Sequence, residues 1–252
     1  MKPSRPEADT APGAATMPGA ATMPGAATMP GAPTMPGGDP RAFGVSFAPE
    51  HDWSAASPLV FPVLRPAGTR GTSLDALVTP VSAAGDTQPV IDPGPADLVV
   101  AYAISAAGFD VLASGDHVAA WAVSPATLRE AAFRNLAAWS REAPWSEDAD
   151  DRRRIVSSDT GDGWDAARIL LPEVTAHLAA TLGGDGGRVL VGVPARHLLL
   201  AGALRPDDPE FGILFADFVL DYAEDSDEAI DRRVFELVAG RLVPFSTGEP
   251  AA

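Results

Sequence analysis

Three segments of the chain place apolar residues at the spacing of an amphipathic helix. The first runs from about Pro125 to Trp139 and follows Ser124, whose hydroxyl can cap a helix that begins with proline. The second is Pro172 to Leu182, with Gly183 expected as a left-handed cap. The third follows Asp208-Pro209, which repeats the cap-plus-proline start. Its apolar face, expected to pack on the core or on a second copy, consists of Phe211, Leu214, Phe215, Phe218, Val219 and Tyr222.

Shorter apolar runs predict strands in the first half of the chain. Leu98 to Ile104 is unbroken and predicts a buried central strand, with Phe109 to Ala113 pairing as a hairpin. Leu59 to Leu64 contains Pro62, which lacks an amide proton, so it predicts an edge strand or a strand pair broken at the proline. The stretch from Asp116 to Val123 fits either a helical turn or a strand.

The C-terminal half adds one strand and one hairpin. Arg188 to Val193 predicts an apolar strand that Pro194 closes. Val234 to Val238 and Arg241 to Phe245 flank Ala239-Gly240, a two-residue hairpin turn. Because helices and strands do not alternate regularly, the pattern predicts an α+β fold, a mixed or antiparallel sheet with about three packed helices.

The N-terminal segment has a different composition. Between Ala11 and Gly38 a six-residue unit, Pro-Gly-Ala-Ala-Thr-Met, recurs, and all five methionines lie at or before Met35. Such a segment cannot bury enough apolar area to offset its ordering entropy. Residues 1–40 are therefore predicted to be a disordered low-complexity tail that tethers a single domain, residues 41–252.

Composition excludes several classes of function. The chain of 252 residues has 18 basic and 34 acidic side chains, a formal charge of −16 and no cysteine. The negative charge makes nucleic acid and anionic membranes poor partners, and the lack of cysteine excludes disulfides and thiol chemistry. No apolar run approaches the roughly 20 residues that cross a bilayer, and Met1 to Thr10 has no apolar signal core, so a cytoplasmic location is expected.

The negative charge is concentrated in two runs. Glu147 to Asp151 precedes three arginines, and a second acidic run extends from Asp221 to Asp231. Charge runs are usually solvated loops, and the alternative is a surface that binds a basic protein partner.

No sequence motif indicates a particular reaction. The chain contains no nucleophile elbow, Walker loop, His-Glu-x-x-His or strand-following Gly-x-Gly-x-x-Gly. Asp159 to Asp165 resembles a calcium loop, but Gly161, Gly163 and Leu170 occupy positions that need oxygen ligands, which leaves a polar turn or an irregular cation site. No cofactor, metal site or catalytic residue is predicted.

Arg196-His197 is the most promising pair of polar residues, because it directly follows a buried strand. The alternative is a structural role, in which Arg196 pairs with a carboxylate. His177 lies beside apolar helix residues and is expected to be a partly buried structural side chain.

Five segments, taken in order, resemble the YtpQ-like bacterial domains of unknown function. The resemblance covers about Leu59 to Phe245 and is carried by Leu98–Ile104, Leu128–Leu136, Ala167–Glu173, Val191–Arg196 and Val234–Phe245. It implies a fold and candidate positions, because that family has no established reaction.

Three short motifs carry the candidate positions. Asn135-Leu136 matches an Asn-Leu pair that ends a helix in the family, and Ala167-Arg168 matches a Ser-Arg element with alanine for serine. Pro194-Ala195-Arg196-His197 matches a Pro-Ser-Arg-Asp element, with His197 in place of the acidic member. The departures at Ala167 and His197 imply that chemistry resting on those groups would be compromised.

Two functional hypotheses follow. The leading one is a non-enzymatic binding or regulatory module on a flexible tether. The alternative is a small-anion-binding domain or enzyme in which Arg168 and Arg196 converge on an anion, with Tyr102 or His197 nearby for proton transfer. Asn135 is expected to fasten neighbouring backbone groups, and a purely structural or secretion-accessory role is a third reading.

Overall fold

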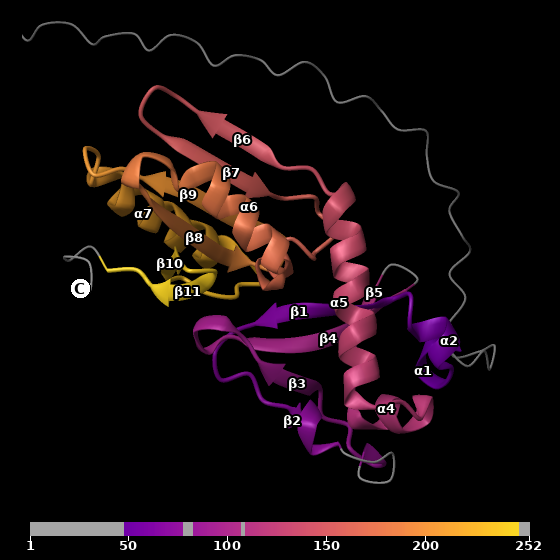
Figure 1. Ribbon diagram of the computed structural model, residues 1–252. Coiled ribbons are helices and arrows are strands. Elements are labelled where there is room, and N and C mark those ends of the chain that lie inside the picture. The colour runs from indigo at the N-terminus through magenta and orange to yellow at the C-terminus, as the bar shows by residue number, and fades with distance from the viewer. Residues whose placement is uncertain (1–47, 78–82, 107–108, 247–252) are drawn as a thin grey trace, which may run out of the picture. The chain divides into compact units, whose positions relative to one another are not determined.

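The computed structural model describes residues 48–77, 83–106 and 109–246 (Figure 1). The expected N-terminal tail, residues 1–40, lies outside these ranges. The described part of the chain is α+β, as the sequence predicts, but its strands form two sheets and not one.

The first sheet is mixed. Its strand order is β1-β4-β3-β2, with β5 also paired to β4, and only the β2–β3 pair is parallel. The predicted central strand is β4, β5 pairs with it antiparallel, and Pro62 lies in β1 at the edge of the sheet, so these three predictions are confirmed. The strands are β1 (Val60–Arg65), β2 (Thr72–Ser73), β3 (Val90–Pro93), β4 (Val99–Ala106) and β5 (Phe109–Leu112).

Helix α5 (Pro125–Glu142) packs on β1, and it extends three residues beyond the predicted end. The backbone amide of Thr127 donates to the Ser124 hydroxyl at 3.1 Å, which confirms the predicted cap. The undecided stretch before it is a helix, α4 (Gly115–Trp121), which Ser114 and His117 cap reciprocally. The short helices near the start are α1 (Ala48–His51) and α2 (Trp53–Ala56), with single 3-10 turns at Leu74–Ala76 and at Pro95–Asp97.

The second sheet is antiparallel throughout, with the order β11-β10-β8-β9-β7-β6. The β10–β11 hairpin is confirmed, and its turn residues Ala239 and Gly240 both have positive φ, 48° and 76°. The strands are β6 (Ser146–Ala149), β7 (Arg154–Ser158), β8 (Arg188–Ala195), β9 (Leu198–Leu204), β10 (Val234–Val238) and β11 (Arg241–Pro244).

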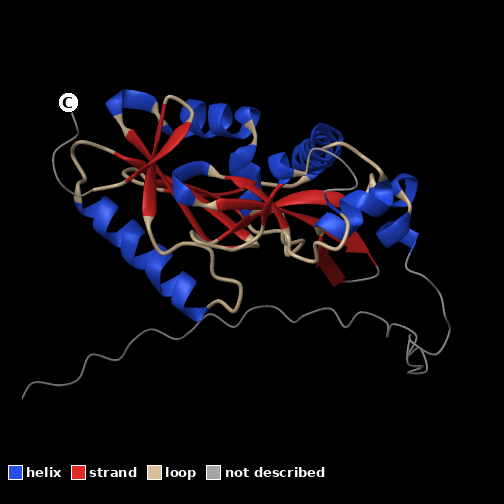
Figure 2. Ribbon diagram, turned by 90° about the horizontal axis from the view of Figure 1, so that it is seen from below, coloured by secondary structure: helices blue, strands red, loops and turns tan. Residues whose placement is uncertain are grey.

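The two faces of the second sheet pack against different layers (Figures 1 and 2). One face, which we call the inner face, contributes Val189, Val191 and Leu199 to the core shared with the first sheet and with α6 (Pro172–Leu182). The opposite, outer face carries Leu190 and Leu200, which pack against α7 (Glu210–Asp225). The strands β8 and β9 are consequently buried along almost their whole length.

Two glycines allow α7 to lie close to the outer face. A Cβ at Gly192 would stand 2.5 Å from Cγ2 of Val219, and one at Gly202 would stand 2.8 Å from Cζ of Phe211. Since these distances are shorter than normal van der Waals contacts, α7 fits only because both strand positions lack a side chain.

Several local predictions are wrong in detail. Gly183 ends α6 with φ −83°, not in the left-handed region, because the chain continues into a 3-10 turn, Gly184–Gly186. Pro194 does not close its strand, since β8 continues to Ala195 through a register shift that accommodates the proline. Helix α7 begins at Glu210, so Pro209 and not Asp208 is its N-cap residue. The Asp208 carboxylate binds Arg153 at 2.7 Å, and a hydrogen bond from the Phe211 amide also lowers its pKa.

Two larger expectations also need correction. The first acidic run is only partly a loop: Glu147 and Asp148 lie on β6, whereas Asp150 and Asp151 lie in the turn before β7, which begins at Arg154. The predicted apolar face of the third helix is only partly core. Phe211, Phe215 and Val219 are buried, whereas Leu214 and Phe218 are 44% and 53% exposed.

Candidate functional site

Arg168 is buried at the end of α5, on the 3-10 turn Ala166–Leu170, with 1% of its surface exposed. Its Nη2 donates to the carbonyls of Ser140 and Ala143, at 3.0 and 3.4 Å, and its Nη1 donates to the Pro144 carbonyl at 3.3 Å. The last carbonyls of a helix have no partner within the helix, so this guanidinium caps α5.

A hydroxyl links Arg168 to the nearest buried carboxylate. Nη1 of Arg168 donates to Oγ of Ser158 at 2.6 Å, and Ser158 donates to Oδ1 of Asp165 at 2.5 Å. Burial lowers the pKa of Arg168 to about 10, against the opposing effect of the Asp165 charge. Arg168 therefore remains charged at neutral pH, and its donors are directed to protein groups.

Arg196 and His197 form the turn between β8 and β9. The Arg196 guanidinium binds the carboxylate of Asp110 on β5, donates to the Gly163 carbonyl at 3.0 Å and stands 3.5 Å from Glu228. It also lies over the indole of Trp164, 4.8 Å from the ring centroid. The pairing of Arg196 with a carboxylate that the sequence offered as its structural role is present, and it joins the two sheets.

His197 lines a shallow recess beside the same turn. Its Nε2 lies 3.0 Å from the hydroxyl of Tyr222, and the recess of about 540 Å³ is otherwise lined by Asp225, Ser226, Asp227 and Glu228. Burial and the charge of Asp159 raise the pKa of Tyr222, so its phenol stays protonated at neutral pH. The described residues contain no group of three His, Asp or Glu side chains arranged to hold a metal ion.

Tyr102 lies in the first sheet and is fully buried. Its hydroxyl donates to Asp92 at 2.5 Å, and Asp92 also accepts two hydrogen bonds from Arg129, each 2.6 Å. Burial and the Asp92 carboxylate raise the pKa of Tyr102 far above its ordinary value. This phenol is therefore unsuited to proton transfer near neutral pH.

Asn135 holds the start of the first sheet. Its side-chain amide donates to the carbonyls of Ser57 and Val60, at 2.7 and 2.8 Å. The expected role of Asn135, to fasten neighbouring backbone, is what the structure shows.

The five residues singled out by the sequence do not form one site. Arg168 and Arg196 share no hydrogen-bonding partner among the described residues, since Arg168 caps α5 whereas Arg196 binds Asp110 and Glu228. Tyr102 contacts a third group of residues, around Asp92. The geometry does not favour an anion held jointly by Arg168 and Arg196.

The exposed surface of α7 combines acidic and apolar side chains, which distinguishes it from the surroundings of the five residues above. Glu210, Asp217 and Asp221 recur at spacings of seven and four residues, so they form an acidic ridge along the solvent side of the helix. Apolar residues flank this acidic ridge on both sides: Leu214 and Phe218 on one flank, and Ile213 and Leu220, 53% and 38% exposed, on the other.

A groove runs beside the first flank, between α7 and β7. Its volume is about 380 Å³. We call it the α7–β7 groove; it is lined by Asp148, Arg153, Ile155, Ser157, Leu200, Phe211, Leu214, Phe215 and Phe218. Its one basic side chain, Arg153, is already paired with Asp208 at 2.7 Å and lies 4.0 Å from Glu210. The hydrogen bond from Arg153 lowers the pKa of Asp208, so that carboxylate is ionised at neutral pH.

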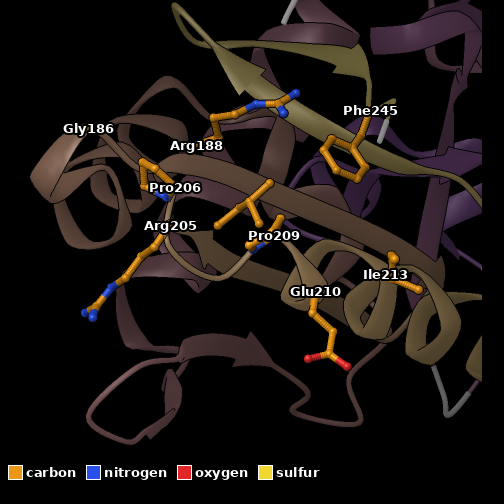
Figure 3. A pocket seen from close by; sticks show the side chains of 9 residues that line it. Gly186, Arg188, Arg205, Pro206, Pro209, Glu210, Ile213 and Phe245 are labelled. Carbon is orange, nitrogen blue, oxygen red and sulfur yellow. The ribbon is translucent and has the colours of Figure 1, made fainter. Parts of the chain in front are cut away.

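A second hollow, the Ile213 pocket, lies beside the other flank and has a volume of about 610 Å³ (Figure 3). Leu204 is among its lining residues. In Figure 3, Pro209 lies between Pro206 on one side and Ile213 and Phe245 on the other. The polar ends of Arg205 and Glu210 extend away from Phe245. Its polar groups therefore do not converge on one point, as they would in an active site.

The sequence indicates parts of this surface but not their combination. The helical period of α7 marks Leu214 and Phe218 as apolar positions, but it does not say how far the sheet reaches beneath them. The sequence offers two separate signals, an apolar stripe too wide for one contact and an acidic run that begins at Asp221, and neither indicates that both lie on the exposed side of one helix.

Comparison with protein-family models, with curated proteins and with solved structures finds no match for this chain. In the ranges that the structure describes, no helix is both long enough and apolar enough to cross a membrane. The candidate site is therefore assigned from the structure alone. It is the acidic ridge of α7 with its exposed apolar flanks, on the outer face of the second sheet.

Proposed function

We propose that the protein is a non-enzymatic binding module that recognises a basic protein partner through α7. The observation that carries this proposal is the exposure of Ile213, Leu214 and Phe218 beside an acidic ridge. Exposed apolar clusters with a charged rim are typical of protein interaction surfaces. A cytoplasmic location, a tethering role for residues 1–40 and kinship with the YtpQ-like domains belong to the same proposal.

The negative charge of this surface indicates that the partner is positively charged. With a formal charge of −16 and carboxylates along α7, the protein attracts cationic surfaces and repels a second copy of itself. Carboxylates at the rim act mainly on the association rate, and salt screens them.

A charge-reversal pair tests the proposal. The probe is a synthetic amphipathic peptide of about 18 residues, five helical turns, built from Lys, Leu and Ala; its counterpart has Glu in place of Lys. We expect the Lys peptide to bind the wild-type protein and the Glu peptide not to bind. Asp217→Lys with Asp221→Lys should weaken Lys-peptide binding about tenfold at low salt, measured by fluorescence anisotropy.

The matched control reverses two carboxylates on another helix, Glu130→Lys with Glu142→Lys on α5, for the same change in net charge. If both double variants lose binding equally, attraction is not localised on α7 and the proposal is wrong. It is equally wrong if the Lys peptide fails to bind the wild-type protein at any salt concentration.

A further inference from the structure

Helix α7 covers only part of the outer face of the second sheet. α7 lies chiefly over β8 and reaches β9 and β10 at its margins. The strand order places β7 and β6 beyond β9, on the side away from β10. Neighbouring strands are about 4.8 Å apart, so β7 lies about 10 Å from β8, which is the usual distance between two packed helices.

The uncovered strand presents a partly apolar surface at that position. Ile155 of β7 packs against the same cluster as Phe211 and Phe215, and Ser157 lines the α7–β7 groove two residues further on. The small side chain of Ser157 leaves room above the strand, while Leu214 and Phe218 form the wall on the α7 side. The groove therefore has the floor and one wall of a helix-binding site.

Carboxylates border the α7–β7 groove on both sides. The ridge residues Asp217 and Asp221 lie on α7 beside Leu214 and Phe218, and Asp148 of β6 lines the opposite side of the groove. Arg153 also lines that side, but Asp208 neutralises its charge at 2.7 Å. An occupant with basic residues on both margins of an apolar stripe would be complementary to this groove.

We propose that the α7–β7 groove binds an amphipathic α-helix of the partner, which lies beside α7 and covers β7. This inference rests on the proposed function and specifies its partner: an apolar stripe at i, i+4 and i+7, bordered by Lys or Arg. The same acidic borders disfavour a second copy of this chain. Residues 11–38 of the chain's own N-terminal segment contain no basic residue, so they lack the required charge.

The test separates helical pattern from charge. One peptide of about 18 residues carries Leu at i, i+4, i+7 and i+11 with Lys on the margins, and a second has the same composition with the stripe scrambled. We expect the striped peptide to bind at least about tenfold more tightly than the scrambled one, because only the stripe fills the groove. Amide chemical shifts should change at Ile155 and Ser157 as well as at Leu214 and Phe218.

Three single substitutions on α7 test whether the peptide binds in the groove: two change residues that line the α7–β7 groove, and one changes a residue outside it. Leu214→Asp and Phe218→Asp should each lower the affinity of the protein for the striped peptide about tenfold. Ile213→Asp, on the opposite flank of the same helix and equally solvent-exposed, adds the same charge and should change binding less than about threefold. All three side chains are exposed, so the fold should tolerate each change, and circular dichroism checks this.

The outcomes distinguish the two proposals. Equal binding of striped and scrambled peptides, with the charge dependence intact, overturns the helix-in-groove inference and leaves the basic-partner proposal standing. Binding that responds only to Ile213→Asp also overturns the inference. A dimer in light scattering that Phe218→Asp dissociates would assign the groove to a second copy. Because all five methionines precede position 36, Overhauser contacts between methionine methyls and Phe218 would assign it to the chain's own N-terminal segment.

Discussion

The guanidinium of Arg168 lies over the indole of Trp145, with Cζ 3.8 Å from the ring centroid. The same group caps the last turn of α5, so the charge binds a helix end and an aromatic face together. A residue that the sequence presents as an anion-binding candidate thus holds α5 to the region between the two sheets.

Replacing Arg168 should therefore cost stability. Arg168→Met leaves the carbonyls of Ser140 and Ala143 without their buried donor and the buried Asp165 carboxylate without its nearby positive charge, and we expect a loss of about 3–5 kcal/mol in the free energy of unfolding. Urea denaturation followed by tryptophan fluorescence measures it. Arg141→Ala, at an exposed arginine on the same helix, is the control and should cost less than about 0.5 kcal/mol. Similar losses for the two variants would contradict the assigned role.

Asn135 gives a second stability prediction. Asn135→Ala removes two hydrogen bonds to carbonyls at the start of β1, which should destabilise the protein by about 1–3 kcal/mol. Asn135→Asp should be at least as costly, because a carboxylate cannot donate to a carbonyl. Arg134→Ala, one residue away on the exposed side of α5, serves as the control in the same thermal or urea denaturation. An Asp variant as stable as wild type would show that these bonds contribute nothing.

The contact between Gly192 and Val219 predicts a specific rescue. Gly192→Ala places a methyl 2.5 Å from Cγ2 of Val219, so α7 must shift, at an expected cost of about 1–3 kcal/mol. Val219→Ala in the same chain should recover part of this loss, which a double-mutant cycle would measure. Gly184→Ala is the matched control, since nothing lies within 4 Å of its added methyl. Additive losses in the cycle would mean that the two side chains do not compete for space.

The network around Asp92 predicts a pH dependence. Burial raises the pKa of Asp92, but hydrogen bonds from Arg129 and Tyr102 outweigh it, so the pKa lies below its ordinary 3.8. A carboxyl whose pKa is lowered by folding stabilises the protein above its unfolded pKa, and this contribution disappears as the pH falls through the lowered value. The stability difference between wild type and Asp92→Asn should be constant from neutral pH to about pH 5 and shrink below about pH 4.

Urea denaturation of both proteins at each pH measures that difference. Asp75→Asn is the comparison, because Asp75 binds the same arginine at 2.6 Å but its side chain is 74% exposed. An exposed ion pair contributes little, so this variant should differ little from wild type at every pH. A wild-type advantage over Asp92→Asn that grows as the pH falls would refute the assignment.

Local signals in the sequence were sufficient for much of the fold. Ser124-Pro125 fixes the start of α5, and positive φ at Ala239 and Gly240 follows from a two-residue hairpin turn. β6 and β7 were missed because the edge strand is polar and fully exposed, so it lacks the alternation that marks a half-buried strand. Their pairing is held by the neighbouring β9, which no local pattern reveals.

The candidate site was less accessible to sequence reasoning. The role of Asn135 and the carboxylate partner of Arg196 were anticipated from residue chemistry. The role of Arg168 depends on carbonyls about 25 residues earlier in the chain, from Ser140 to Pro144, so only the folded structure reveals it. Likewise, the exposure of Leu214 depends on the width of the sheet beneath α7, which is a property of six strands and not of one helix.

One end of the second sheet is formed by β6, whose four residues are all exposed and include Glu147 and Asp148. A strand with a free side offers backbone groups to any other chain, and adjacent like charges oppose that addition. Copies of this protein should therefore resist polymerising strand to strand, even while an apolar groove lies open one strand away.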